Sequence, residues 1–466
     1  MAEQLLQKQL SDREAEQILL KALAGRKGAL TRADAVALTG LPEAASAEAL
    51  RSLMATYRSH LAVTEEGELL YRFDPDLVRR DRVPLAERID RIAAALWRGF
   101  TVAFKIGIVV TLVFYVVAFL AIMIGLVLAS NASDREDRRG GDSGFGFPWL
   151  LWWMMPDWAP PQARRREAFG RPRKRFYRAV FDFVFGPPTP PLDLLARERQ
   201  ICAYIRSASG RITATDLVAL TGWSHTHADE EATRLLAAYD GEPEVAPDGT
   251  LVYSFPKLRK TTGEGPAGKW SYAWQERPTA LELTGNTSGT NAAIGIMNGF
   301  NLFAAATVGP AFLTSAGLHT AGAEVAVFWF PLLFSALFFA IPAARWWRRR
   351  GEQRQRDRAQ ARAALLHELV DRRGAAAPPE ELVTIAQARS GAAVKLVREE
   401  LERLLVDLDG DVTTSTDGQM RYSFPRIEEE LAAAAAARAT ARSSEQTPGE
   451  VVFSSDDEEP PPTRLN

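Results

Sequence analysis

Two histidines and an aspartate form the tightest group of possible metal ligands in this chain. His225, His227 and Asp229 follow one another at the start of a predicted helix, where imidazole and carboxylate groups could hold a metal ion. A metal site needs a wider ligand set than this short cluster offers. The alternative is a solvated first helical turn, and we assign no metal ligand.

Other signatures of catalysis are missing. There is no nucleophile elbow, and no complete phosphate loop in which Gly-x-x-x-x-Gly-Lys is followed by Ser or Thr. The single cysteine, Cys202, excludes a disulfide within the chain and a metal cage made of cysteines alone. We therefore predict neither an enzyme nor a bound cofactor.

Polar and small residues lie within and just before an apolar stretch, residues 292–316. They are Asn291, Gly295, Asn298, Gly299 and Asn301. Gly-x-x-x-Gly lets helix backbones approach closely, and asparagine hydrogen-bonds across helices. Packing within the chain's own helices is the first interpretation. The alternatives are a contact between copies of the chain and a path for a polar ligand or ion.

Three apolar blocks predict membrane-spanning helices. The first covers residues 101–129 and carries one charge, Lys105, which leaves more than the roughly 20 apolar residues that a span needs. The other two form a hairpin over residues 291–344. Seven arginines between positions 345 and 358 follow it, so the positive-inside rule places that end in the cytoplasm, or in the stroma of a plastid.

Aromatic residues flank these spans. Residues 130–190 predict a Gly/Arg-rich loop, an aromatic interfacial segment and an amphipathic helix. Tryptophan favours the membrane interface, and the expected anchors are Trp149, Trp152, Trp153, Trp158, Trp270, Trp274, Trp346 and Trp347. If the aromatic segment enters the membrane and returns, all three repeats described next share one side. Otherwise the first repeat lies opposite the other two.

A segment of about 60 residues occurs three times, at residues 13–78, 194–258 and 359–427. In the first two copies a glycine precedes a tyrosine by 43 residues, as in Gly28 and Tyr71. Apolar spacing, capping residues and a turn glycine predict three helices and then a β-hairpin. This is the order of a winged helix. The fold class is therefore α+β, with three winged-helix-like repeats and about three transmembrane helices.

Winged helices often bind DNA through their third helix. In the second repeat that helix carries Asp229, Glu230 and Glu231 against Arg234 alone, and the hairpin tips are acidic. Neutralisation of phosphate dominates DNA affinity, so these faces disfavour nucleic acid. After the third repeat, residues 428–466 predict an Ala-rich helix and a disordered acidic tail.

Several short motifs resemble, in their order, a family of uncharacterised membrane proteins from cyanobacteria and chloroplasts. They lie at residues 71–73, 138–146, 181–186, 240–243, 253–256, 269–270 and 299–302. Some plant members of that family carry a label of iron–sulphur cluster biosynthesis. Cys202 alone does not support it, because a cluster needs several thiolates.

We therefore expect an integral membrane protein that acts as a scaffold or assembly factor through protein contacts. The alternative is a membrane-tethered regulator that binds DNA or a small ligand. Expected partners are membrane lipid, an unidentified protein and a second copy of the chain. The Ala/Arg-rich composition predicts a multi-pass protein of a bacterial inner membrane, with repeats 2 and 3 in the cytoplasm and the side of repeat 1 open.

Overall fold

A computed structural model describes residues 11–26, 28–79, 85–133, 174–188, 193–262, 268–276, 282–415, 418–441 and 449–455. The chain forms two compact units that alternate along the sequence. Unit 1 comprises Met1–Val83, Pro191–Thr279 and Arg354–Asn466, and unit 2 comprises Pro84–Pro190 and Ala280–Gln353. The stretches that were expected to repeat all fall in unit 1, where they are called segments 1, 2 and 3.

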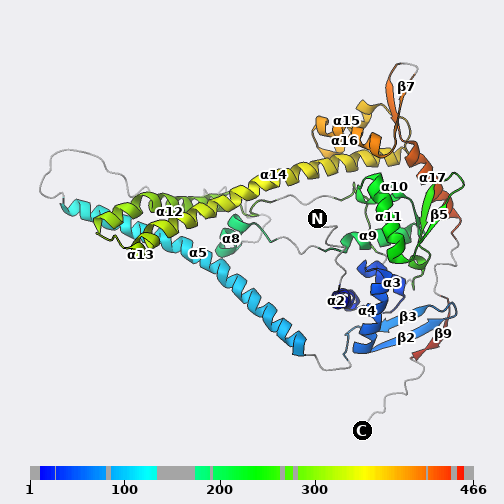
Figure 1. The fold of residues 1–466 in the computed structure, drawn as a ribbon, viewed down its shortest axis with the longest axis horizontal. Coiled ribbons are helices and arrows are strands. Elements are labelled where there is room, and N and C mark those ends of the chain that lie inside the picture. Colours follow the sequence, from blue (N-terminus) through cyan, green and yellow to red (C-terminus); the bar gives the residue numbers. More distant parts are fainter. Residues whose placement is uncertain are drawn as a thin grey trace, which may run out of the picture. The chain divides into compact units, whose positions relative to one another are not determined.

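Each segment contributes helices and then a β-hairpin (Figure 1). Segment 1 contains α2 (Asp12–Leu23), β1 (Ala29–Leu30), α3 (Arg32–Thr39), α4 (Glu43–Thr56), β2 (Ser59–Thr64) and β3 (Leu69–Phe73). Segment 2 contains α9 (Ala196–Ser207), β4 (Arg211–Ile212), α10 (Ala214–Thr221), α11 (His225–Tyr239), β5 (Glu242–Val245) and β6 (Leu251–Ser254). Segment 3 contains the end of α14 (Phe330–Asp371), then α15 (Pro379–Ser390), α16 (Val394–Asp407), β7 (Asp411–Thr414) and β8 (Met420–Ser423).

In segments 2 and 3 a glycine is hydrogen-bonded to the aromatic residue that ends the hairpin. The carbonyl of Gly210 accepts the backbone N–H of Phe255 at 2.8 Å, and Gly374 accepts that of Phe424 at the same distance. Both glycines have a positive φ, +74° and +75°, which other residues adopt only with strain. Both hairpins therefore end at the backbone of their glycine, although 45 residues separate the pair in segment 2 and 50 in segment 3, and both aromatic rings are buried.

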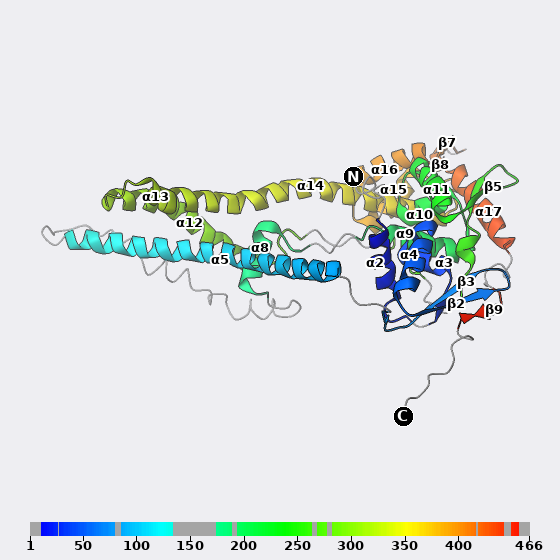
Figure 2. The ribbon, with the colours of Figure 1, turned by 60° about the horizontal axis from the view of Figure 1, so that its bottom comes forward.

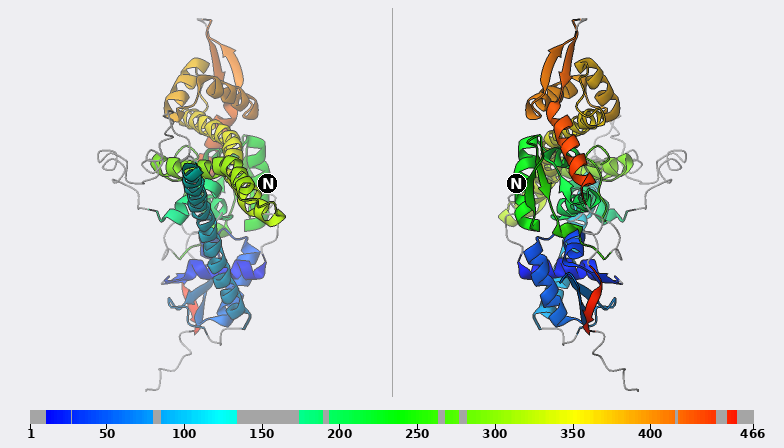
Figure 3. Two further views of the ribbon diagram at one scale, coloured as in Figure 1. Left: turned by 90° about the vertical axis from the view of Figure 1, so that its left-hand side faces the viewer. Right: turned by 90° about the vertical axis from the view of Figure 1, so that its right-hand side faces the viewer.

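A continuous hydrophobic core joins the segments. Val36 of segment 1, Leu217 of segment 2 and Leu401 of segment 3 belong to the same cluster of buried residues. After segment 3, α17 (Pro425–Ala439) turns back and lies across α10 and the strands of segment 2 (Figure 3). Unit 1 is therefore one packed body and not three separate modules.

Unit 2 consists of long apolar helices. They are α5 (Leu85–Ser133), α12 (Ser288–Ser315), α13 (Ala321–Glu324) and α14 (Phe330–Asp371), with a π-helical turn at Val325–Trp329; the last turns of α14 belong to unit 1. The stretches Ala95–Ala129, Ser288–Ser315 and Ala321–Asp371 are long and apolar enough to cross a membrane. Figure 2 shows α12 alongside α5. The prediction of mixed helix and sheet with three apolar spans is confirmed.

Two of the expected segments make contacts within the chain. The amphipathic helix α8 (Phe176–Phe185) buries Val180 and Val184 against Leu112 and Phe338 of the apolar helices, so its apolar face is covered by the chain itself. Within the tail that was expected to be disordered, Val451–Ser454 forms strand β9 and pairs with β2. The aromatic segment with Trp149, Trp152, Trp153 and Trp158 lies outside the described residues.

Candidate functional site

One buried carboxylate forms the joint between segments 1 and 2. Asp34 closes the capping box of α3, and its Oδ2 accepts the backbone N–H of Thr31 at 3.1 Å. Its Oδ1 accepts hydrogen bonds from Arg206 Nη2 at 2.8 Å and from Thr261 Oγ1 at 2.7 Å. The Asp34 side chain is only 5% exposed. A residue typical of a helix start therefore also binds segment 2 and the chain that follows it.

Burial and hydrogen-bond partners act in opposite directions on Asp34. Burial, the largest influence, raises the pKa of this carboxyl group, because the charged form loses water. The hydrogen bond from Thr261 and the charge of Arg206 help to outweigh burial, so the pKa lies below the ordinary value of 3.8. Asp34 is therefore ionised at neutral pH and its charge is satisfied inside the joint.

Segment 2 carries the same acceptor at its own joint with the C-terminal part of unit 1. Asp216 closes the capping box of α10 with Thr213, and Arg438 of α17 donates to its Oδ2. The hydroxyl of Tyr204 donates to Oδ1 at 2.6 Å. Burial, and then the negative charge of Asp216, raise the pKa of Tyr204, so it remains a proton donor. We call the pairs Asp34–Arg206 and Asp216–Arg438 the arginine locks.

The opposite ends of α3 and α10 also hold neighbouring parts of unit 1. Each helix ends at a left-handed glycine, Gly40 or Gly222. The Gly40 carbonyl accepts the Tyr239 hydroxyl at 3.1 Å, and the Gly222 carbonyl accepts Arg362 Nε at 2.8 Å. Both ends of each short helix therefore hold the unit together.

His225, His227 and Asp229 do not form a metal site in the structure. His225 Nε2 lies 2.6 Å from Glu430 Oε1 of α17, and the His227 ring packs against Trp223. Asp229 accepts the Tyr253 hydroxyl. In the described part of the chain, no group of three His, Cys, Asp or Glu side chains has metal-binding geometry. The expected solvated turn is wrong for His225, because α17 buries it.

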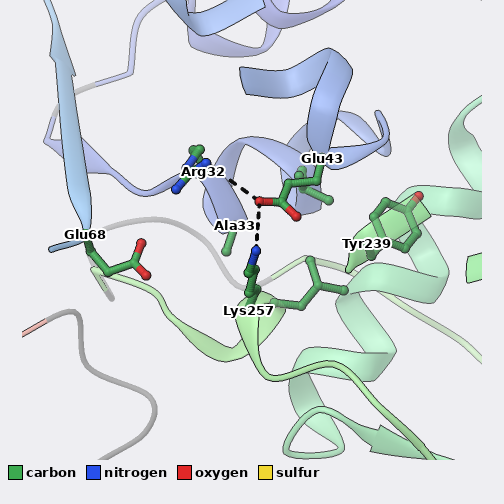
Figure 4. A pocket seen from close by; sticks show the side chains of 8 residues that line it. Arg32, Ala33, Glu43, Glu68, Tyr239 and Lys257 are labelled. Carbon is green, nitrogen blue, oxygen red and sulfur yellow. Dashed lines mark ion pairs between the residues drawn. The ribbon is translucent and has the colours of Figure 1, made fainter. Parts of the chain in front are cut away.

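A small cavity lies between segments 1 and 2 (Figure 4). Glu43 of α4 lies between Arg32 Nη1 and Lys257 Nζ, at 3.8 Å from each, and Tyr239 and Glu68 line the same space. Its volume of about 40 Å³ holds a few water molecules. This volume is far below the several hundred Å³ that a site for an organic ligand needs. These charges neutralise one another across the joint.

Residues 263–269 match the spacing of a phosphate loop without its hydroxyl residue. The position after Lys269 holds Trp270. Neither residues 260–262 before this stretch nor residues 268–270 at its end lie in a strand or helix, whereas a phosphate loop joins the two. The sequence therefore lacks the hydroxyl residue, and the described residues on either side lack the strand and the helix of a nucleotide site.

The asparagines of α12 bind within the chain. Asn298 Nδ2 donates to the Ser335 carbonyl and Asn301 Nδ2 to the Leu112 carbonyl, each at 3.0 Å, while Asn291 Nδ2 donates to Thr284 Oγ1 at 2.8 Å.

The glycines of the same helix are placed differently. A Cβ added to Gly295 or Gly299 would meet no described atom within 4 Å. The close approach is at Gly309, where it would lie 2.9 Å from the Val327 carbonyl oxygen. The Gly-x-x-x-Gly pair therefore forms no close helix contact among the described residues.

The four described tryptophans that were expected as membrane anchors fall into two groups. Trp270 and Trp274 pack against the core of unit 1, where Trp270 meets the Tyr204 ring at 4.9 Å and Trp274 stacks on the His367 ring at 5.0 Å. Trp346 and Trp347 are 47% and 74% exposed at the end of the apolar part of α14. The first pair has structural partners in unit 1, which leaves the second pair as interface candidates.

The arginine locks were not predicted from the sequence. Thr31 with Asp34 and Thr213 with Asp216 share one capping motif, and its recurrence was the available signal. Neither arginine stands in a comparable pattern.

Comparison with known proteins gives one distant relative. The chain is 27% identical over 349 residues to an uncharacterised chloroplastic protein of Arabidopsis thaliana. The match covers 68% of this chain and 65% of the relative, so it spans slightly less than two thirds of the relative's length. No family model matches the chain, and no solved structure matches it.

This relative corrects the expected location. A bacterial inner membrane was predicted from composition, but the similar protein belongs to a plant chloroplast, so that prediction is wrong. The content of alanine and arginine does not indicate in which membrane a protein resides. The relative agrees with an uncharacterised family of chloroplast type, and its description says nothing of iron–sulphur clusters.

Proposed function

We propose that this chain is a membrane-anchored scaffold or assembly factor whose unit 1 binds other proteins. The observation that carries the proposal is the pair of arginine locks, which fasten segment 1, segment 2 and the helix α17 that follows segment 3 into one body. Asp34, Asp216 and His225, the buried groups best suited to chemistry, are all used in structural contacts. A rigid body with several exposed faces suits protein assembly better than catalysis, and we propose no enzymatic activity.

We further propose that the three segments are winged-helix-like repeats that have lost DNA binding. The order of helices and hairpin supports this interpretation. On the third helices, Arg51 pairs with Glu48 and Arg403 with Glu400, while Glu230 is 73% exposed. Phosphate would meet acidic side chains and, at Arg51 and Arg403, cations that already have a carboxylate partner.

A small-ligand regulator is the second candidate, because segment 3 contains a groove. The groove has a volume of about 450 Å³, within the range of ligand sites, and Val383, Leu401 and Tyr422 are among its lining residues. Arg398 Nη1 and Glu380 Oε1, 2.8 Å apart, neutralise each other at the same groove.

We propose a chloroplast membrane as the location, by analogy with the relative. The apolar helices of unit 2 would span it, with Trp346 and Trp347 at the interface and the arginines that follow facing the stroma. Because the segments form one unit, all three would lie on that side. A cysteine introduced at Arg51, Glu230 or Glu402 should then react with a membrane-impermeant maleimide from the same side.

Photo-crosslinking in the native membrane tests the scaffold proposal. The full-length chain would carry a photoreactive amino acid at Glu230 or Glu402 of unit 1, and at Val113 of α5 as the control. A discrete protein adduct from unit 1 and none from Val113 is the expected result. Adducts with lipid alone, or salt-sensitive retention of duplex DNA, would refute the proposal.

A further inference from the structure

The hairpin of segment 1 differs from the other two at its outer edge. Strand β9 pairs antiparallel with β2, which places Ala62 opposite Ser454 and Val63 opposite Phe453 (Figure 1). The sheet of segment 1 therefore has the order β1-β3-β2-β9. Among the described residues, the corresponding strands β5 and β7 pair on one side only. The C-terminal segment thus binds to the edge of another part of the chain.

Backbone pairing, and not burial, holds β9 in place. The N–H of Glu65 donates to the Glu450 carbonyl and the N–H of Leu61 to Ser455 Oγ, each at 2.9 Å. Val451, Val452 and Phe453 remain 52%, 66% and 49% exposed. The register also shifts between Val63 and Thr64, so the ladder is irregular. A four-residue strand held in this way separates more easily than a strand with a buried face.

The acidic turn beside β9 makes the chain's own tail a poorly matched occupant. Glu450 lies directly opposite Glu65, and like charges in opposed positions destabilise strand pairing. Gly449 lies beside Glu66, whose carboxylate is paired with Lys260 Nζ at 3.4 Å, so Glu65 carries the charge that faces Glu450. A lysine or arginine at the position of Glu450 would meet the opposite charge.

We propose that the outer edge of β2 binds an extended peptide strand of a partner protein, and that residues 450–455 are a built-in competitor for it. The partner segment carries a basic residue and then two or three β-branched or aromatic residues, in the order that Glu450 to Phe453 occupy. Backbone pairing supplies the affinity and the acidic turn selects the charge. This inference rests on the proposed function and names one of its binding surfaces.

The test uses the full chain and a variant that ends at Ala441. The probe is a fluorescent peptide with the sequence of residues 448–457, prepared also with Glu450→Lys. A tethered tail competes at millimolar effective concentration. The peptide should therefore bind the shortened chain at least tenfold more tightly than the full chain. The Glu450→Lys peptide should bind at least threefold more tightly than the unaltered one.

Matched controls separate strand pairing from apolar adhesion. Leu61 and Glu65 point their N–H groups toward β9, so alternation gives Val63 the same direction. Val63→Pro in the shortened chain removes this donor without touching the ladder to β3, and should abolish binding, whereas Val63→Ala should not. Methylation of the peptide N–H at Phe453, which lies opposite Val63, should abolish binding.

A stability control keeps the test decisive if the shortened chain folds poorly. Glu450→Lys in the full chain should strengthen docking of the tail and weaken binding of the added peptide further. Equal binding to full and shortened chains, or indifference to methylation at Phe453, would overturn the inference. So would a dimer that is lost on truncation, because the tail would then exchange between copies. Photo-crosslinks from unit 1 without peptide binding would refute this inference alone, and peptide binding without crosslinks would refute the scaffold.

Discussion

Replacement of Arg206 by methionine tests the arginine lock between segments 1 and 2. Methionine keeps much of the aliphatic stem but removes the guanidinium group that donates to Asp34. Arg206 is 21% exposed and Asp34 is 5% exposed, so the pair is largely shielded from water. The change leaves a buried carboxylate without its cation.

The free energy that Arg206→Met costs depends on the hydrogen bonds that Asp34 keeps. Breaking a buried ion pair costs about 3–5 kcal/mol when nothing replaces the lost partner. Asp34 keeps the hydrogen bonds from Thr261 and Thr31, so the loss is closer to that of one charge-assisted hydrogen bond, about 1.5–3 kcal/mol. This corresponds to a roughly 10- to 100-fold increase in opening of the joint.

Hydrogen exchange of the full-length protein in detergent measures this opening. The amides of α3 should exchange about 10- to 100-fold faster in Arg206→Met, with α15 of segment 3 unchanged. Arg51→Met is the matched control, because Arg51 and its partner Glu48 are 71% and 60% exposed. Arg51→Met should change the rate of amide hydrogen exchange by about twofold or less. The reasoning fails if the two variants behave alike, or if Arg206→Met accelerates all three segments equally.

Three further predictions concern the same unit. Gly40→Ala and Gly222→Ala each force a residue into the left-handed region at a cost of about 1–2 kcal/mol. Gly40→Ala should lower the thermal midpoint further, because its Cβ would lie 2.9 Å from the Leu195 oxygen, whereas at Gly222 the nearest atom is 3.6 Å away; equal midpoints would contradict this. Burial raises the pKa of Cys202 to about 12, so a thiol reagent at pH 8 should modify it only after unfolding, and rapid modification of the native protein would count against the buried position. Because the native pKa of Asp34 is lowered, its charge stabilises the fold above about pH 4, and this contribution is lost as pH falls through the native pKa. Asp34→Asn should therefore lower the urea midpoint at pH 7 and have progressively less effect as pH falls below 3.8, and a deficit independent of pH would refute the ionic role.

Features set by neighbouring residues were predictable from the sequence. The capping of α3 by Thr31 and its end at Gly40 follow from local chemistry, and long apolar runs identify the helices of unit 2. Contacts between distant residues were not predictable, since Arg206 and Asp34 are 172 positions apart and nothing near either indicates the other.

Aromatic and tail residues show why some interpretations failed. A Trp-rich stretch fits both a membrane interface and a packed surface. Trp274 stacks on the ring of His367, which lies far along the chain. The tail was expected to be disordered because of its overall composition, although Val451, Val452 and Phe453 form a short run with strong strand preference. Whether such a short apolar run within a polar tail forms a strand depends on a distant sheet edge, which the sequence does not reveal.

The position of β9 and α17 in the chain has a consequence for biosynthesis. The hairpin of segment 1 is complete at Phe73, but β9 begins at Val451, 378 residues later. At about 5–20 residues per second, the ribosome needs roughly 20–80 s to make the intervening chain. During that interval the apolar helices are also synthesised, and the outer edge of β2 remains without strand β9. Unit 1 therefore closes only after the apolar helices have been synthesised, and a chain that stops before Arg438 lacks both the Asp216 lock and strand β9.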